Sequence, residues 1–161
     1  MPTPPNHRYS VRNFIKGKIG EIVFEEMFRK AGQYTVLPFG YERTLPVLAQ
    51  YSHLAEYKPV LENVRRAPDF ILVSNDKTRV YLVEVKYRRN LDETDWVELA
   101  RTVKETWPVT WLFVATPDGF YFDSFTNIIK NEGKLAELNT GWVDEKTQKE
   151  FREVLGEFIQ S

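Results

Sequence analysis

The hydrophobic and polar positions of the chain first predict a long helix over residues 10–31, where apolar residues recur every three or four positions. Gly32 follows at a favourable C-cap position. Residues 40–67 contain two prolines, and we expect a long insertion over a cleft, with a short helix around 47–57. The remaining pattern predicts strands at 34–39, within 67–90, at 111–116 and at 120–123, and helices at 92–106, 126–138 and 144–159.

This order of elements, α-β-β-β-α-β-β-α-α, predicts an α/β fold with a mixed β-sheet flanked by helices. The strand–helix–strand step calls for parallel pairing and a right-handed crossover. With 161 residues, we expect a single domain over 1–161, with a core at about 10–123 and a C-terminal helical extension at about 124–161. Asp92 is the expected N-cap of the helix at 92–106.

A β-hairpin is predicted within residues 67–90, because 75–78 is the only turn-like stretch there. A four-residue loop pairs Ser74 with Arg79, which sets Asp69 opposite Glu84. Both faces of the hairpin are largely apolar, as expected for a central strand pair that is covered on both sides.

Three charged residues, Asp69, Glu84 and Lys86, gather on one face of this hairpin at its open end. Two carboxylates that lie opposite each other repel unless a proton or a cation lies between them, and a divalent metal ion is one solution. The alternative is a structural salt bridge from Lys86 to Glu84 or Asp69. A slip of one residue in the register would turn Asp69 to the other face of the hairpin, so Asp69 and Glu84 could no longer share a metal ion.

Composition narrows the kinds of site and compartment. The chain has no cysteine and only two histidines, so a metal would be held mainly by oxygen, which suits Mg²⁺ or Mn²⁺ better than zinc. No apolar run reaches the length of a membrane span, and the lack of cysteine is compatible with a cytoplasmic location.

The charges are unevenly distributed along the chain. Residues 1–90 carry 15 Lys and Arg against 9 Asp and Glu, whereas residues 91–161 carry 7 against 14. The basic half could face a polyanion, or it could be an ordinary solvated surface.

Pro68-Asp69, followed 15 residues later by Glu84-Val85-Lys86, resembles the motif of the PD-(D/E)XK nuclease superfamily, which includes restriction endonucleases and Holliday junction resolvases. The αβββαβ core of that family would cover about residues 10–123. The resemblance implies Mg²⁺-dependent hydrolysis of phosphodiester bonds in DNA, with Mn²⁺ as a substitute ion. Asp69, Glu84 and the carbonyl of Val85 would hold the metal, and Lys86 would orient or deprotonate the attacking water.

Many members of that family add a glutamate from the first helix, in a setting similar to Gly20-Glu21. At 100° per residue, Glu21 falls at the edge of the apolar arc of this helix, from which it can reach the sheet. Glu25 lies deeper in the polar arc and is the substitute. Gly20 lies inside the apolar arc, which would let the helix approach the sheet closely.

Nucleic-acid contacts are predicted at the basic residues around the motif. They are Arg88, Arg89, Arg65 and Arg66, with Lys18, Arg12 and Lys16 as additions. The glutamine that the family often places on the next helix is absent, and Arg101 or Lys104 could contact phosphate instead.

The four tryptophans are expected to pack in the core rather than to stack on bases. The resemblance also suggests a homodimer, because cutting two strands favours two sites.

Two other interpretations stay open. In the first, the chain is a nuclease-fold module without catalysis that binds nucleic acid or a protein partner, for which the acidic helices after Asp144 offer a surface. In the second, the motif is a coincidence in a plain α/β protein, which opposite orientations of Asp69 and Glu84 would indicate.

Overall fold

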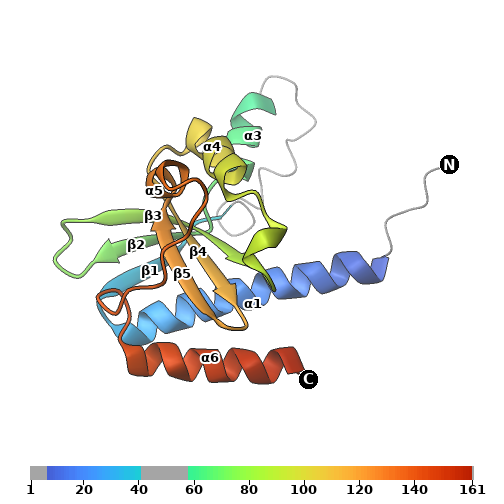
Figure 1. The fold of residues 1–161 in the computed structure, drawn as a ribbon. Coiled ribbons are helices and arrows are strands. Elements are labelled where there is room, and N and C mark those ends of the chain that lie inside the picture. The colour runs from blue at the N-terminus through green and yellow to red at the C-terminus, as the bar shows by residue number, and fades with distance from the viewer. Residues whose placement is uncertain (1–6, 41–57, 161) are drawn as a thin grey trace.

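The computed structural model describes residues 7–40 and 58–160 (Figure 1). The helix expected around 47–57 lies outside the described residues. In chain order, the elements are α1 (His7–Ala31), β1 (Tyr34–Pro38), α3 (Lys58–Arg65), β2 (Phe70–Ser74), β3 (Val80–Tyr87), the 3₁₀ helix η3 (Leu91–Glu93), α4 (Trp96–Thr106), β4 (Thr110–Thr116), β5 (Gly119–Ser124), α5 (Phe125–Lys130) and α6 (Glu145–Gln160).

The sheet has five strands in the order β1-β2-β3-β4-β5. All neighbours are antiparallel except β3 and β4, which are parallel and are joined through α4. The predicted α/β fold with a mixed sheet between helices is therefore confirmed.

Helices cover both faces of the sheet (Figure 1). Helix α1 lies along one face, and α6 runs beside α1 on the side away from the sheet. Helices α4 and α5 cover the other face, where they bury a second apolar cluster that includes Trp96, Leu112 and Phe125. The larger cluster, under α1, includes Phe24, Phe28 and buried side chains of every strand. Strands β3 and β4 are buried between the two helical layers, which explains their nearly continuous apolar sequence.

Helix α1 packs on the sheet through the apolar arc that its sequence predicts. Val23, Phe24, Met27 and Phe28 are buried in this contact. The helix ends at Gly32, whose φ of +74° is the left-handed conformation that favours glycine after a helix.

Two helix boundaries differ from the sequence prediction. The helix expected at 92–106 begins only at Trp96, and its N-cap is Asp95, whose side chain accepts a 3.0 Å hydrogen bond from the Glu98 backbone N–H. The prediction of Asp92 as N-cap is therefore wrong, because 91–93 form a separate 3₁₀ turn. The helix expected at 126–138 ends at Lys130, since the following turn places Glu132 and Gly133 at positive φ. The sequence prediction also lacked α3.

The C-terminal segment packs on the sheet through aromatic rings. The ring of Trp142 lies 4.8 Å from Phe122, 5.1 Å from Tyr81 and 5.3 Å from Trp111, measured between centroids. Trp96 is buried as well, and Trp107 meets the ring of Phe39. Trp96 therefore lies in the core as predicted, whereas Trp107, Trp111 and Trp142 are half-buried and pack against it.

Within the described residues, none of the helices has the length and apolar character needed to cross a membrane.

Candidate functional site

The hairpin that carries the motif has the predicted register. Ile71 pairs with Leu82 and Val73 with Val80, and the backbone N–H of Ser74 donates to the carbonyl of Arg79. The β2–β3 ladder ends at Phe70, one residue after Asp69. Continuing the register would set Pro68 opposite Val85, but proline has no backbone N–H and closes the ladder there. The two strands therefore separate at the motif.

Asp69 fills the place where the ladder stops. Its Oδ2 accepts a 2.8 Å hydrogen bond from the backbone N–H of Val85. Its backbone carbonyl accepts hydrogen bonds from the N–H groups of Phe39 and Gly40, at 2.9 and 3.1 Å. Asp69 is thus held on both sides, by the end of β1 and by β3, and its carboxylate has a fixed position.

The environment of Asp69 disfavours its charge. Burial raises its pKa to about 7, and the negative charges of Glu84 and, more weakly, Glu21 act in the same direction. The Val85 hydrogen bond and the Lys86 ammonium lower the pKa but do not compensate. The carboxylates of Asp69 and Glu84 do approach each other, so the condition for a coincidental motif, opposite orientations, is not met. In the protein alone, a proton on Asp69 relieves their repulsion.

Lys86 forms an ion pair with Glu84 at the same point. Its Nζ donates to Glu84 Oε1 at 2.6 Å. Burial lowers the pKa of Lys86, but the charges of Glu84 and Asp69 outweigh burial and leave this pKa above its usual value. The salt bridge that the sequence offered as the alternative to a metal is therefore present, and the ammonium stays charged at neutral pH.

Glu21 of α1 lies near the acidic pair of Asp69 and Glu84, whereas Glu25 is turned to another partner. Glu21 lies close enough to influence the pKa of Asp69, and its Oε2 is 3.2 Å from Lys18 Nζ. Glu25 pairs with Arg29 at 2.7 Å, one turn further along the helix. Close packing at Gly20 brings Glu21 to the sheet, because a Cβ on this residue would lie 3.3 Å from the Cβ of Tyr87.

The donor chemistry of this group suits a hard cation only in part. Asp69 and Glu84 supply carboxylate oxygens, which are ligands for Mg²⁺ or Mn²⁺. Across residues 7–40 and 58–160, however, no three Asp, Glu, His or Cys side chains are gathered closely enough to hold a metal ion. The pair is therefore in place, and Glu21 would have to turn from Lys18 to join it.

A hollow of about 850 Å³ opens beside Asp69 and Lys86, whereas Glu84 is not among the residues that line it. Asp69, Glu21 and Lys86 contribute to its lining, and so does Val85. Its walls come from the N-terminal half of α1 and from the end of β3 with the residues after it. The other lining residues are Arg12, Asn13, Lys16, Gly17, Tyr87, Arg88, Arg89, Glu93 and Thr94.

Only some of the basic residues that were predicted to bind nucleic acid line the hollow beside Asp69. Arg88 and Arg89 line the hollow. Arg65 and Arg66 are exposed at the end of α3 and are not part of its lining. Lys18 is also outside the lining and lies 5.6 Å from the ring centroid of Phe14 as well as beside Glu21.

Arg12 and Lys16 line the hollow in place of these residues, although the sequence suggested them only as additions. Placing α1 at 100° per residue puts both of them on the face that carries Gly20 and Val23. That signal could have identified them, because the face that packs on the sheet also faces the motif. On α4, Lys104 donates to Thr126 Oγ1 at 3.0 Å, and neither Lys104 nor Arg101 lines the hollow.

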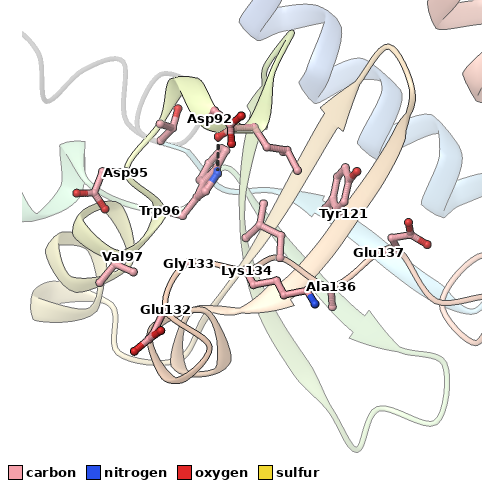
Figure 2. A pocket seen from close by; sticks show the side chains of 13 residues that line it. Asp92, Asp95, Trp96, Val97, Tyr121, Glu132, Gly133, Lys134, Ala136 and Glu137 are labelled. Atoms are coloured by element: carbon pink, nitrogen blue, oxygen red, sulfur yellow. Dashed lines mark hydrogen bonds between the residues drawn. The ribbon is translucent and has the colours of Figure 1, made fainter.

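A second hollow lies between the start of α4 and the segment after α5, and its charge is different (Figure 2). Asp92, Asp95, Glu132 and Glu137 surround it, with Lys134 as the only cation among its lining residues. Such a negative rim would repel a polyanion. Of the two hollows, the one beside Asp69 is therefore the candidate for binding nucleic acid.

A scan against protein-family models and a search of curated proteins both returned no match for this chain. The interpretation of the site depends on its geometry and on the motif that it contains.

Proposed function

We propose that this protein is a metal-dependent endonuclease that hydrolyses phosphodiester bonds in DNA, as the resemblance to PD-(D/E)XK nucleases implies. The observation that carries the proposal is the meeting of Asp69, Glu84 and Lys86 at the point where β2 and β3 separate, beside a hollow with basic walls. A purely structural ion pair needs Glu84 and Lys86, and a neutral amide could accept the Val85 hydrogen bond, so neither role requires a second, buried carboxylate.

In this proposal, Asp69 and Glu84 hold Mg²⁺ or Mn²⁺, with the Val85 carbonyl and Glu21 as further ligands. The mutual repulsion that raises the pKa of Asp69 supports cation binding, because a divalent ion would relieve it. When bound, the ion would polarise the scissile phosphate and lower the pKa of the attacking water.

Lys86 has a narrower role than the sequence suggests. In the metal-free protein, the charges of Glu84 and Asp69 raise the pKa of Lys86, so its side chain is protonated there and is a poor proton acceptor. Its ammonium can donate a hydrogen bond to the attacking water and stabilise the negative charge that develops on the phosphate. We therefore propose orientation and charge stabilisation rather than deprotonation.

Cleavage of defined DNA substrates tests the proposal. Wild-type protein should cleave at least one of single-stranded, duplex, flap or branched DNA with Mg²⁺ or Mn²⁺ and none in EDTA. Asp69→Ala and Lys86→Ala should each lower the rate at least about 100-fold, because each removes a group that contacts the reacting phosphate or its metal. Lys149→Ala, which removes an exposed lysine of α6, is the matched control and should retain activity. Inactivity of folded wild-type protein on all four substrates with both ions would contradict the proposal.

A noncatalytic nuclease-fold module is the second candidate. The ion pair between Lys86 and Glu84, together with the incomplete metal ligand set of the described residues, favours it. Calorimetric titration with Mg²⁺ and Mn²⁺ separates the two candidates. The enzyme should bind the ion and lose this binding in Asp69→Asn, whereas the module need not bind it.

A further inference from the structure

One face of α1 changes its chemistry along the helix. Around Gly20, Val23 and Phe24, this face is buried against the sheet. Towards the N-terminus, the helix continues past the sheet (Figure 1), and the same face carries Arg12 and Lys16, which line the hollow. The helix thus holds two cations over an open space that ends at the candidate catalytic residues.

The opposite wall of the hollow holds Arg88 in a preset position. Its Nη1 donates to the Tyr87 carbonyl at 2.8 Å, and its Nε donates to Thr94 Oγ1 at 2.6 Å. The guanidinium carbon also lies 5.8 Å from the ring centroid of Trp96. A guanidinium has five N–H donors, so these two bonds leave donors for a ligand. Because the position is fixed before binding, less side-chain entropy is lost when a phosphate is bound.

The two walls together favour a polyanion. Apart from the candidate catalytic residues, the charged lining residues are the cations Arg12, Lys16, Arg88 and Arg89 against one acid, Glu93. One helical turn separates Arg12 from Lys16, which is about 6 Å along the axis. A duplex strand carries one phosphate per roughly 3.4 Å of helix axis, so this spacing corresponds to about two phosphate steps along the duplex.

From this arrangement, we infer that the hollow is a channel for the sugar–phosphate backbone of one nucleic-acid strand, which α1 and the end of β3 grip through its phosphates regardless of base sequence. The inference rests on the proposed function, since it places the scissile phosphate beside Asp69 and Lys86. Base edges are read mainly by paired donors and acceptors of amide groups, or by guanidinium groups that are not occupied by phosphate. Among the lining residues, Asn13 is the only amide, the Thr94 hydroxyl is engaged by Arg88, and this inference assigns the guanidiniums of Arg12, Arg88 and Arg89 to phosphates.

Gly17 provides a test that leaves the existing side chains unchanged. It lines the hollow directly after Lys16, and a Cβ placed on it would meet no atom within 4 Å. Gly17→Glu therefore adds a negative charge inside the channel without a steric clash. Gly156 of α6 has the same open space, so Gly156→Glu makes the same change in charge and residue type on another surface.

Binding is measured by fluorescence anisotropy with fluorescein-labelled DNA of mixed sequence, as single strands and as duplex, in EDTA to prevent cleavage. Gly17→Glu should weaken binding at least tenfold and Gly17→Lys should strengthen it, whereas Gly156→Glu should change it less than twofold. With four cations in the channel, the slope of log K against log salt should be about −3 in the wild type. Arg12→Gln and Lys16→Gln should each reduce its magnitude by about 0.7–0.9. Two unrelated base sequences should bind within about threefold.

Three results would overturn the inference of a channel. They are equal effects of Gly17→Glu and Gly156→Glu on DNA affinity, no DNA binding by the wild type at low salt, and a difference in affinity above tenfold between two base sequences. These results are separate from those that decide catalysis. If the wild type cleaves DNA but Gly17→Glu binds normally, the channel is wrong and the proposed function stands. If the channel variants behave as expected but no substrate is cleaved, the channel stands and the proposed endonuclease activity is wrong.

Discussion

At the scale of single residues, Asp69 is the group that the surrounding structure forces into an unfavourable state. It ends a strand after a proline, accepts a hydrogen bond from Val85, and lies among the negative charges of Glu84 and Glu21. The N–H donor and the ammonium of Lys86 hold it in place, but burial and the neighbouring acids keep its pKa near 7. The residue therefore lowers stability when it is charged, and a bound cation or proton would remove that cost.

This predicts a particular dependence of stability on pH in metal-free protein. The unfolded state loses the Asp69 proton near pH 4, while the folded state keeps it until about pH 7, so folding stability falls as pH rises between these values. The Asp69→Asn variant has no carboxyl group at this position, so it lacks this loss of stability. The difference between its free energy of unfolding and that of the wild type should therefore increase by up to ~4 kcal/mol from pH 4 to pH 8 and then level off.

Urea denaturation in EDTA at several pH values measures this difference. Glu84→Gln is the second variant, because removing its charge should bring the pKa of Asp69 closer to its ordinary value and flatten the profile of an otherwise wild-type protein. Parallel profiles of wild type and Asp69→Asn between pH 4 and pH 8 would show that Asp69 is not perturbed.

At the scale of elements, the contact between α1 and β3 positions the site. Gly20 allows the helix to approach Val85 and Tyr87, the strand residues that flank Lys86. The same contact brings Glu21 towards Asp69 from one side and places Arg12 and Lys16 over the hollow. A change in the distance between helix and strand would therefore alter both the acidic group and the channel.

Leucine substitutions at two glycines of α1 should have opposite effects. Gly20→Leu should lower the free energy of unfolding by about 2 kcal/mol, because a side chain there forces the helix away from a central strand. Gly17→Leu should raise it by roughly 0.5–1 kcal/mol, since leucine is the better helix former and the position is open. Chemical denaturation checks both values. Equal effects at the two positions would mean that helix propensity, not the contact with β3, decides stability.

At the scale of the whole molecule, the segment after β5 is packed into the same core as the sheet. Leu138, Val143 and Leu155 belong to the buried cluster under α1. Trp142 meets rings from four strands, and Lys30 of α1 pairs with Glu150 of α6. The C-terminal residues therefore help to hold α1 on the sheet, although they lie outside the core that the sequence predicted at about residues 10–123.

Trp142→Ala should consequently destabilise the molecule by about 3 kcal/mol, as expected for removing a large aromatic side chain from a packed cluster. Trp107→Ala, which removes a half-buried tryptophan whose ring contacts only Phe39 among the described aromatic residues, should cost less. Far-ultraviolet circular dichroism and tryptophan fluorescence should report one unfolding transition in both variants. Separate transitions would show that the C-terminal segment folds independently of the sheet.

What the sequence by itself determined is what local physics controls. The period of apolar residues and Gly32 defined α1, because a helix depends on contacts three and four residues apart. The register of β2 and β3 was also predicted from the sequence, through the turn at 75–78, and the structure confirms it. The alternation of side chains did not by itself exclude a slip of one residue, because both faces of the hairpin are apolar. From that register alone, Asp69 could be placed next to Glu84.

Only the tertiary structure decided what depends on distant segments. The hydrogen bond from Val85 to Asp69 exists because the strands separate at Pro68, and the raised pKa arises from burial by elements far apart in the chain. Spacing along α1 places Arg12 and Lys16 on its packing face, but where α1 crosses the sheet decides that this face continues over the hollow. Residue types and short-range spacing carry no information on such crossings, because packing of the whole molecule sets them.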